Sequence, residues 1–232
     1  LSNRSSTTKV IIDDIKDFKR EYKRERRTVI DNVEEAVFEE KKIEKMDVVV
    51  LIDRFGYARS VDVPTYERNK DAAEAESKYI ITCTNMDKLA VFTDKGNLHT
   101  LKVLSLPFGK FRDKGQPIDN MSNFSSSAET IVAIESVENM AGKKILFGNS
   151  SGYIKVVDGS EFDVAKKTTA ATKLSDNETV IIVKPLNGDE TLIMESSDRN
   201  FLRIVCAEIP EKKKNAIGVR GIKLSGKDYV EN

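Results

Sequence analysis

A strand–turn–strand unit that recurs four times constrains the fold of this chain more than any other feature of its 232 residues. Each copy has a short run of β-branched and apolar residues, a tight turn and a second such run, which is the signature of a β-hairpin. The copies span residues 48–61, 89–103, 144–157 and 191–205. Their key turn positions hold residues that tolerate a positive φ, as a tight hairpin demands: Gly56, Gly96, Gly152 and Asn200.

The spacing of these turns fits the blades of a propeller. The turns recur at roughly 40 to 56 residues, the range that a blade of four strands occupies. Further strand candidates, 79–84, 130–136 and 179–184, lie between the hairpins. We therefore expect residues 46–232 to form an all-β β-propeller or β-pinwheel of repeated four-stranded blades, with about four blades or part-blades. A closed ring needs more, so we expect the missing blade or blades beyond Asn232 in a longer protein.

The first 45 residues follow a different pattern. From Thr8 to about Arg27 apolar residues recur at three- and four-residue steps, which predicts an amphipathic helix with Thr7 or Thr8 as its cap. We assign residues 1–30 to this short α-helix. Residues 31–45 are expected to form a connection that can also pair as a strand.

Composition limits the classes of function. Lys plus Arg and Asp plus Glu both number 38, so any affinity for nucleic acid must come from segregated charge. Cys83 and Cys206 lie in apolar runs without the paired spacing of a zinc or redox site, which predicts buried, reduced thiols. Because no apolar stretch approaches the roughly 20 residues of a membrane span and no signal-peptide core is visible, we expect a cytoplasmic protein without a membrane partner.

Basic loops follow the second, third and fourth hairpins, at residues 109–115, 166–169 and 212–221. Taken alone, a lysine-rich loop is more often a solvated surface than a binding site. Loops at equivalent places in successive blades, however, would lie on one rim of a disc and give a neutral protein a positive edge. This repetition favours binding to the phosphates of DNA.

Three motifs carry a resemblance to a known family: the helix end 19–30 with its Arg26-Arg27-Thr28 run, the first hairpin turn 53–59, and the segment 218–228. In this order they resemble the C-terminal part of the A subunit of bacterial type IIA topoisomerases, DNA gyrase and topoisomerase IV. In that family the end of a coiled-coil arm leads into a β-pinwheel that binds and bends DNA around its rim. The chain begins at Leu1 without a methionine, so we expect a fragment of such a subunit.

The resemblance implies partners and cofactors. It implies double-stranded DNA as the ligand, a B subunit with the ATPase in an A2B2 holoenzyme, and an A-subunit homodimer formed through other parts of the protein. ATP and magnesium belong to the holoenzyme, an ATP-hydrolysing isomerase associated with the nucleoid, and none is expected in this fragment. No catalytic or metal-binding residue is assigned, because the DNA-breaking tyrosine belongs to a domain that this sequence lacks.

The resemblance also turns the basic residues into candidate DNA contacts, which bind phosphates without reading bases. The first choices lie in the basic loops and just after the last one: Lys110, Arg112, Lys114, Lys212, Lys213, Lys214, Arg220 and Lys223. The second choices lie in the hairpins and the middle loop: Arg54, Arg59, Lys155, Lys166 and Lys167.

One departure separates two members of the family. The A subunits of gyrase carry a Gln-Arg-Arg-Gly-Gly-Lys-Gly box in the first blade, whereas here Arg68 is followed by the run 69–75, Asn-Lys-Asp-Ala-Ala-Glu-Ala. The nearest remnant is at 112–115. Because the box serves to wrap DNA, its absence favours a topoisomerase IV-like protein, with a divergent gyrase as the alternative.

Other functions are weighed against this one. A propeller that binds protein would need an exposed apolar or aromatic patch, which 7% aromatic residues and no Trp disfavour. An enzymatic propeller ranks third, because the chain has no phosphate-binding Gly-Lys-Ser/Thr loop and its six tyrosines lie in structural positions. The single histidine, His99, lies within a hairpin strand and is expected to be a packing or surface residue.

Overall fold

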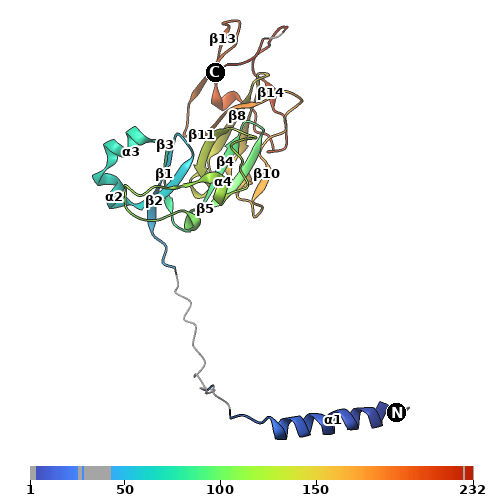
Figure 1. Cartoon of the computed structure of the whole chain (residues 1–232). Helices are drawn as coiled ribbons and strands as arrows, with labels where there is room; N and C mark the ends of the chain where they lie inside the picture. The colour runs from blue at the N-terminus through green and yellow to red at the C-terminus, as the bar shows by residue number, and fades with distance from the viewer. Residues whose placement is uncertain (1–3, 26–27, 29–42, 227, 232) are drawn as a thin grey trace. The chain divides into compact units, whose positions relative to one another are not determined.

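A computed structural model describes residues 4–25, 28, 43–226 and 228–231. The chain divides into two compact units, one up to Ile43 and one from Glu44 onward (Figure 1). Within the described residues no helix is long and apolar enough to cross a membrane, and no group of three or more His, Cys, Asp or Glu side chains could hold a metal ion.

The first unit contains helix α1, Arg4–Glu21. Its apolar side chains are exposed, among them Ile15 and Phe18, and i,i+3 ion pairs such as Arg20–Asp17 support its charged face. The helix starts one turn before the expected cap at Thr7 or Thr8 and ends before Arg27, because the apolar period stops at Tyr22. The expected connection 31–45 and the Arg26-Arg27 run lie almost wholly outside the described residues.

The second unit is built from antiparallel sheets that we number as blades (Figure 1). Blade 1 has the order β3-β1-β2-β6, blade 2 the order β10-β5-β4-β7, blade 3 the order β11-β8-β9-β14, and β12 and β13 form a two-stranded blade 4. The strands of blades 1 and 2 are β1 Asp47–Asp53, β2 Tyr57–Asp62, β3 Ser77–Thr84, β4 Lys88–Thr93, β5 Asn97–Lys102, β6 Gln116–Pro117, β7 Ile131–Ser136 and β10 Thr168–Ala170. Those of blades 3 and 4 are β8 Lys144–Asn149, β9 Tyr153–Asp158, β11 Val180–Leu186, β12 Thr191–Glu195, β13 Phe201–Val205 and β14 Val219–Arg220. The expected all-β architecture of four-stranded blades is confirmed.

Short helices connect these strands. Helices α2 (Val63–Arg68) and α3 (Lys70–Glu76) lie between β2 and β3, and they cover most of the run 69–75. The others are η1 Val103–Ser105, α4 Ile118–Met121, α5 Val137–Met140, η2 Gly159–Phe162 and η3 Cys206–Glu208. Sequence reasoning missed α2 and α3, although Asp62 caps α2 by accepting from the Thr65 amide and Pro64 stands in its first turn.

The four hairpin turns share one geometry. In each turn, the carbonyl oxygen of the first residue accepts a hydrogen bond from the amide of the residue three positions later. The side-chain oxygen of the same first residue accepts a second bond from the amide four positions later. The residue with positive φ is the one three positions on: Gly56 (82°), Gly96 (73°), Gly152 (79°) and Arg199 (61°). The prediction of Asn200 for the fourth turn is therefore wrong by one residue, because that turn starts at Ser196.

The core lies between blades, because both faces of the inner strands are buried. In β4, Leu89 and Val91 join the cluster shared with blade 1, while Ala90 and Phe92 join the cluster shared with blade 3. In β8, Leu146 likewise belongs to a third cluster, shared with blade 4. This alternation fixes the order in which the blades stack, and it makes equivalent positions in successive blades comparable.

Candidate nucleic-acid interface

The fourth strand of each complete blade comes from the segment that follows the next hairpin. After β5 the chain returns to pair β6 with β2, after β9 it pairs β10 with β5, and after β13 it pairs β14 with β9. We call β6, β10 and β14 return strands. The three basic segments of the sequence directly precede them, and we call residues 107–115 loop A, 163–167 loop B and 210–218 loop C. The fold thus puts all three basic loops at one equivalent place in three successive blades.

Loops A and C have the same length and the same attachment. Each starts at a proline whose carbonyl accepts from the strand beneath, Ser60 N to Pro107 O (2.9 Å) in blade 1 and Val156 N to Pro210 O (3.4 Å) in blade 3. Each ends at a glycine, Gly115 or Gly218, where an added Cβ would overlap a backbone carbonyl of β2 or β9. The sequence carries the signal for this match, because a proline and a glycine eight residues apart recur in both loops and align them.

Loop B is shorter and is held at its end. The carbonyl oxygens of Lys166 and Lys167 accept from the Thr100 hydroxyl (3.0 Å) and the Thr100 amide (2.9 Å). Both lysine side chains are exposed.

Most of the predicted contact residues present their charge to solvent. Ten of them are exposed: Arg54, Lys110, Arg112, Lys114, Lys166, Lys167, Lys212, Lys213, Arg220 and Lys223. Two have partners within the protein, since Lys213 Nζ lies 3.2 Å from Glu161 Oε1, and Arg220 Nη2 donates to the Tyr153 hydroxyl at 3.3 Å. Lys214 is half-buried, and its Nζ donates to the Glu161 carbonyl oxygen at 3.0 Å.

The predictions of Lys155 and Arg59 as phosphate contacts need correction. Lys155 is 1% exposed, and its ammonium donates to the carbonyl oxygens of Lys214 (2.5 Å) and Ala216 (2.8 Å). Burial lowers the pKa of Lys155 to about 8. The Arg59 side chain is 13% exposed, lies 5.3 Å from the centre of the Phe111 ring and 3.7 Å from Glu76. Both side chains face a basic loop, loop A for Arg59 and loop C for Lys155, because alternate residues of β2 and β9 point to that side of the strand.

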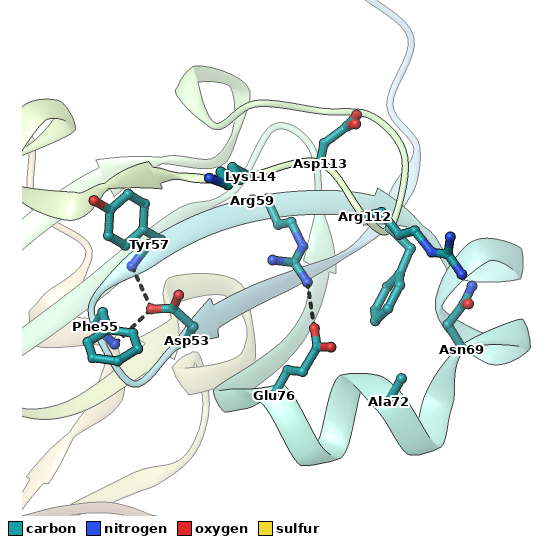
Figure 2. Close-up of a pocket in the computed structure, with 12 residues that line it drawn as sticks. Asp53, Phe55, Tyr57, Arg59, Asn69, Ala72, Glu76, Arg112, Asp113 and Lys114 are labelled. Atoms are coloured by element: carbon teal, nitrogen blue, oxygen red, sulfur yellow. Dashed lines mark hydrogen bonds and ion pairs between the residues drawn. The ribbon is translucent and has the colours of Figure 1, made fainter.

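Blade 1 also has an open cleft of about 810 Å³ between α3, the first hairpin and loop A (Figure 2). Arg59 forms its floor with Glu76, and Arg112 reaches toward Asn69 at its mouth (Figure 2). The exposed Phe55 lies on the hairpin side. Sequence reasoning gave no sign of this cleft, because it depends on the unpredicted helices α2 and α3.

His99 is a packing residue, one of the two outcomes expected for it. It is 2% exposed, and its Nε2 lies 2.8 Å from Glu129 Oε1 and its Nδ1 3.0 Å from Thr168 Oγ1. Burial raises the pKa of Glu129, but hydrogen bonds from Thr93, Asn97 and His99 outweigh burial and hold that pKa below its ordinary value. The group is a satisfied polar core beneath return strand β10.

Both cysteines are buried and free, as expected. Burial, with the nearby carboxylates of Asp87 and Glu138, raises the pKa of Cys83 to about 12. Burial also raises the pKa of Cys206. Neither thiol has the thiolate character that nucleophilic chemistry requires.

Comparison with known proteins shows which proteins the chain resembles. Residues 143–187 and 190–232 match the family model of the DNA gyrase C-terminal domain, beta-propeller. The chain is 27% identical over 234 residues to the gyrase A protein of Lawsonia intracellularis, covering 95% of this chain and 28% of that protein. It is 28% identical over 218 residues to the gyrase A protein of Salmonella typhimurium, covering 89% of this chain and 25% of that protein. The chain thus spans about a quarter of the length of these relatives.

Solved structures agree on the fold. The C-terminal domain of DNA topoisomerase IV superposes with a TM-score of 0.72 at 21% identity, over 82% of this chain and 61% of that one. The E. coli ParC C-terminal domain gives a TM-score of 0.65 at 16% identity, over 81% and 78% of the two chains.

The blades, their exchanged return strands and the matched repeat define the class of protein: a β-pinwheel of the propeller type. These matches make the chain similar to the C-terminal domains of type IIA topoisomerase A subunits, the resemblance that its motifs indicated.

Proposed function

We propose that this chain binds duplex DNA without sequence preference along the edge that carries loops A, B and C, and bends the DNA there. The observation that carries the proposal is the placement of three basic loops at one equivalent position in three successive blades. Lysine and arginine side chains neutralise phosphates and release counterions, and such contacts carry no base information. A positive edge that turns from blade to blade favours a bent duplex.

The direct test is a salt titration of binding. The chain is mixed with two fluorescent duplexes of unrelated sequence, and anisotropy gives the affinity from 50 to 300 mM salt. We expect equal affinities for the two duplexes and a log–log slope of about −0.9 for each phosphate neutralised. Binding that ignores salt, or no binding at 50 mM salt, would count against the proposal.

The wider role belongs to a larger assembly. We infer that the chain supports an ATP-dependent change of DNA topology within a holoenzyme of A and B subunits, in the cytoplasm and at the nucleoid. ATP, magnesium and the DNA-breaking tyrosine would then act in parts of the holoenzyme beyond this chain. The isolated chain should neither relax supercoiled plasmid nor hydrolyse ATP, and relaxation by the pure chain would refute this division of labour.

We further propose that the domain is topoisomerase IV-like, with gyrase-like wrapping as the alternative. Helices α2 and α3 stand where a gyrase domain has its basic box, and α3 carries the acidic residues Asp71, Glu74 and Glu76. An acidic helix repels phosphates at that point. The gyrase names of the curated relatives favour the alternative.

A topological assay separates the two. The chain is bound to nicked circular plasmid, the nick is ligated, and the trapped supercoils are counted per domain. Little trapped writhe supports the topoisomerase IV-like proposal. Strong positive writhe supports wrapping and would show that another loop replaces the box.

A further inference from the structure

A basic residue recurs at one position of the blades, buried in blades 2 and 3 and largely covered in blade 1. It lies three residues after the turn residue with positive φ, in the second strand of each hairpin: Arg59 in β2, His99 in β5 and Lys155 in β9. Each side chain faces the return segment that covers its own strand. In blade 4 the equivalent residue is Leu202, and among the described residues no return strand pairs with β13. A basic residue thus occupies this position in each of the three blades whose return strand is described.

The contacts are clearest in blade 3. The ammonium of Lys155 lies under loop C, with Lys214 O at 2.5 Å, Ala216 O at 2.8 Å and Lys213 O at 3.5 Å. Its remaining neighbours include the Phe147 ring, whose centre is 5.3 Å away. The charged groups around it are Glu161 of η2 and the lysines of the loop itself. Burial of an ammonium group costs free energy of folding unless its N–H donors are hydrogen-bonded, and here backbone carbonyls of loop C accept those bonds.

The other two blades use the same position with different chemistry. In blade 1 the Arg59 guanidinium packs on Phe111, in the middle of loop A, and Arg59 Nη2 pairs with Glu76 of α3. In blade 2, His99 Nδ1 bonds to Thr168, the residue that follows Lys167. In blades 1 and 3 the side chain thus lies under the basic loop, and in blade 2 it lies under return strand β10, which directly follows loop B.

On the basis of the proposed DNA-binding function, we propose that Arg59, His99 and Lys155 are positioning residues. Arg59 and Lys155 hold loops A and C, and His99 holds the return strand that follows loop B, so that the exposed lysines and arginines of the loops face DNA. The three residues need not touch DNA. Their effect on affinity passes through the loops, because an ordered loop loses less conformational entropy when its side chains bind phosphates.

The test compares two variants that should act on different loops. Lys155→Met removes the ammonium under loop C but keeps the length of the side chain. Arg59→Met does the same under loop A. Lys184→Met is the control, because it removes one positive charge from the exposed surface of blade 3, where Lys184 pairs with Glu190 at 3.3 Å. Lys155→Arg restores charge and donors, and the equivalent position of blade 1 already holds an arginine.

The first readout needs no DNA. Limited trypsin digestion of the full chain gives, in one tube, the rates of cleavage after Lys212–Lys214 in loop C and after Lys110–Lys114 in loop A. We expect Lys155→Met to raise the loop C to loop A ratio about tenfold, since hydrogen bonds to a charged donor are among the stronger ones. Arg59→Met should lower the ratio, Lys184→Met should leave it unchanged, and Lys155→Arg should restore most of the wild-type value.

The second readout is DNA affinity. Loss of one phosphate contact lowers affinity about eightfold at 0.1 M salt, because one counterion release scales with salt to the power −0.9. We expect Lys155→Met to bind DNA about eightfold more weakly than the wild type and to have a log–log salt slope smaller by about one. Lys155→Arg should bind with nearly the wild-type affinity and slope.

The outcomes separate the two proposals. An unchanged ratio in a folded Lys155→Met and in a folded Arg59→Met overturns the positioning role, whatever happens to DNA binding. If Lys155→Met does not fold, the ratio in Arg59→Met decides. Wild-type protein that binds no DNA refutes the proposed function while the cleavage ratios still test the loops.

Discussion

Replacement of the basic side chains of loops A and C should have unequal effects on DNA binding. In the first variant Lys110, Arg112 and Lys114 become alanine, and in the second Lys212, Lys213 and Lys214 do. Each variant removes three positive charges, so the formal charge change is matched. The structure distinguishes them, because all three side chains of loop A are exposed, whereas in loop C Lys213 pairs with Glu161 and Lys214 is half-buried.

The magnitude follows from counterion release. Three lost phosphate contacts reduce the magnitude of the salt slope by about 2.7. When salt rises from 50 to 200 mM, the affinity of the wild type should therefore fall by a factor about 40 times larger than the affinity of the loop A variant. In loop C, Lys212 is exposed and has no side-chain partner in the described contacts, Lys213 is exposed but pairs with Glu161, and Lys214 is half-buried. Its slope should therefore fall by about one to two.

Anisotropy titrations of both variants and the wild type, with thermal unfolding as the control for folding, measure these slopes. Both variants should bind unrelated duplexes with equal affinity, since phosphate contacts read no bases. A loop A variant with the wild-type slope would refute the assignment of these side chains as phosphate contacts. A loss confined to one DNA sequence would refute backbone binding.

Three further predictions concern the fold. Phe92→Ala should lower the free energy of unfolding by about 3–5 kcal/mol, because the ring packs edge-on against Phe147 and Phe162 in the blade 2–3 core, whereas Phe55→Ala, 79% exposed, should change it by less than about 0.5 kcal/mol; denaturant unfolding of both variants checks this. Gly152→Ala should lower the free energy of unfolding more than Gly56→Ala in the same assay. Both glycines have positive φ, but only at Gly152 would the added Cβ meet Ile222, at 2.7 Å. Equal losses of stability would show that backbone strain in the turn alone decides. Bonds from Ser160 and Lys144 lower the pKa of Asp158 from 3.8 to about 2, so its contribution to stability is present above pH 4 and is lost as pH falls through 2; Asp158→Asn should flatten that part of the acid-stability curve, and an unchanged curve would show that Asp158 contributes nothing.

The hairpins could be predicted from the sequence because their signals are local. A β-branched run and a turn residue within a few positions specify each pair of inner strands, and the bounds of β4 and β8 follow the expected runs closely. The fourth turn shows the limit of this reasoning. Asn200 is the residue type that tolerates positive φ, yet Arg199 adopts it, because the bonds that Ser196 accepts from the Arg199 and Asn200 amides set the register of the turn.

The features that depend on distant contacts could not be predicted. Return strands such as β6 are two residues long and exist only because they pair with a strand some 60 residues earlier. The buried state of Lys155 has the same origin, since it is covered by loop C, which leads into β14, and β14 pairs with β9. A lysine in a strand that alternates apolar and polar residues ordinarily faces solvent, so the sequence alone indicated that Lys155 contacts a phosphate. In the fold its ammonium instead binds carbonyl oxygens inside the protein.

We propose that DNA contacts one edge of the pinwheel and all three basic loops on that edge. Amide hydrogen exchange of the chain with and without a 30-base-pair duplex, read by mass spectrometry, tests this most directly. We expect protection in loops A, B and C together, and none in the links between blades at 85–87, 141–143 and 187–190. Protection of a single loop, or of the links instead of the loops, would contradict the account.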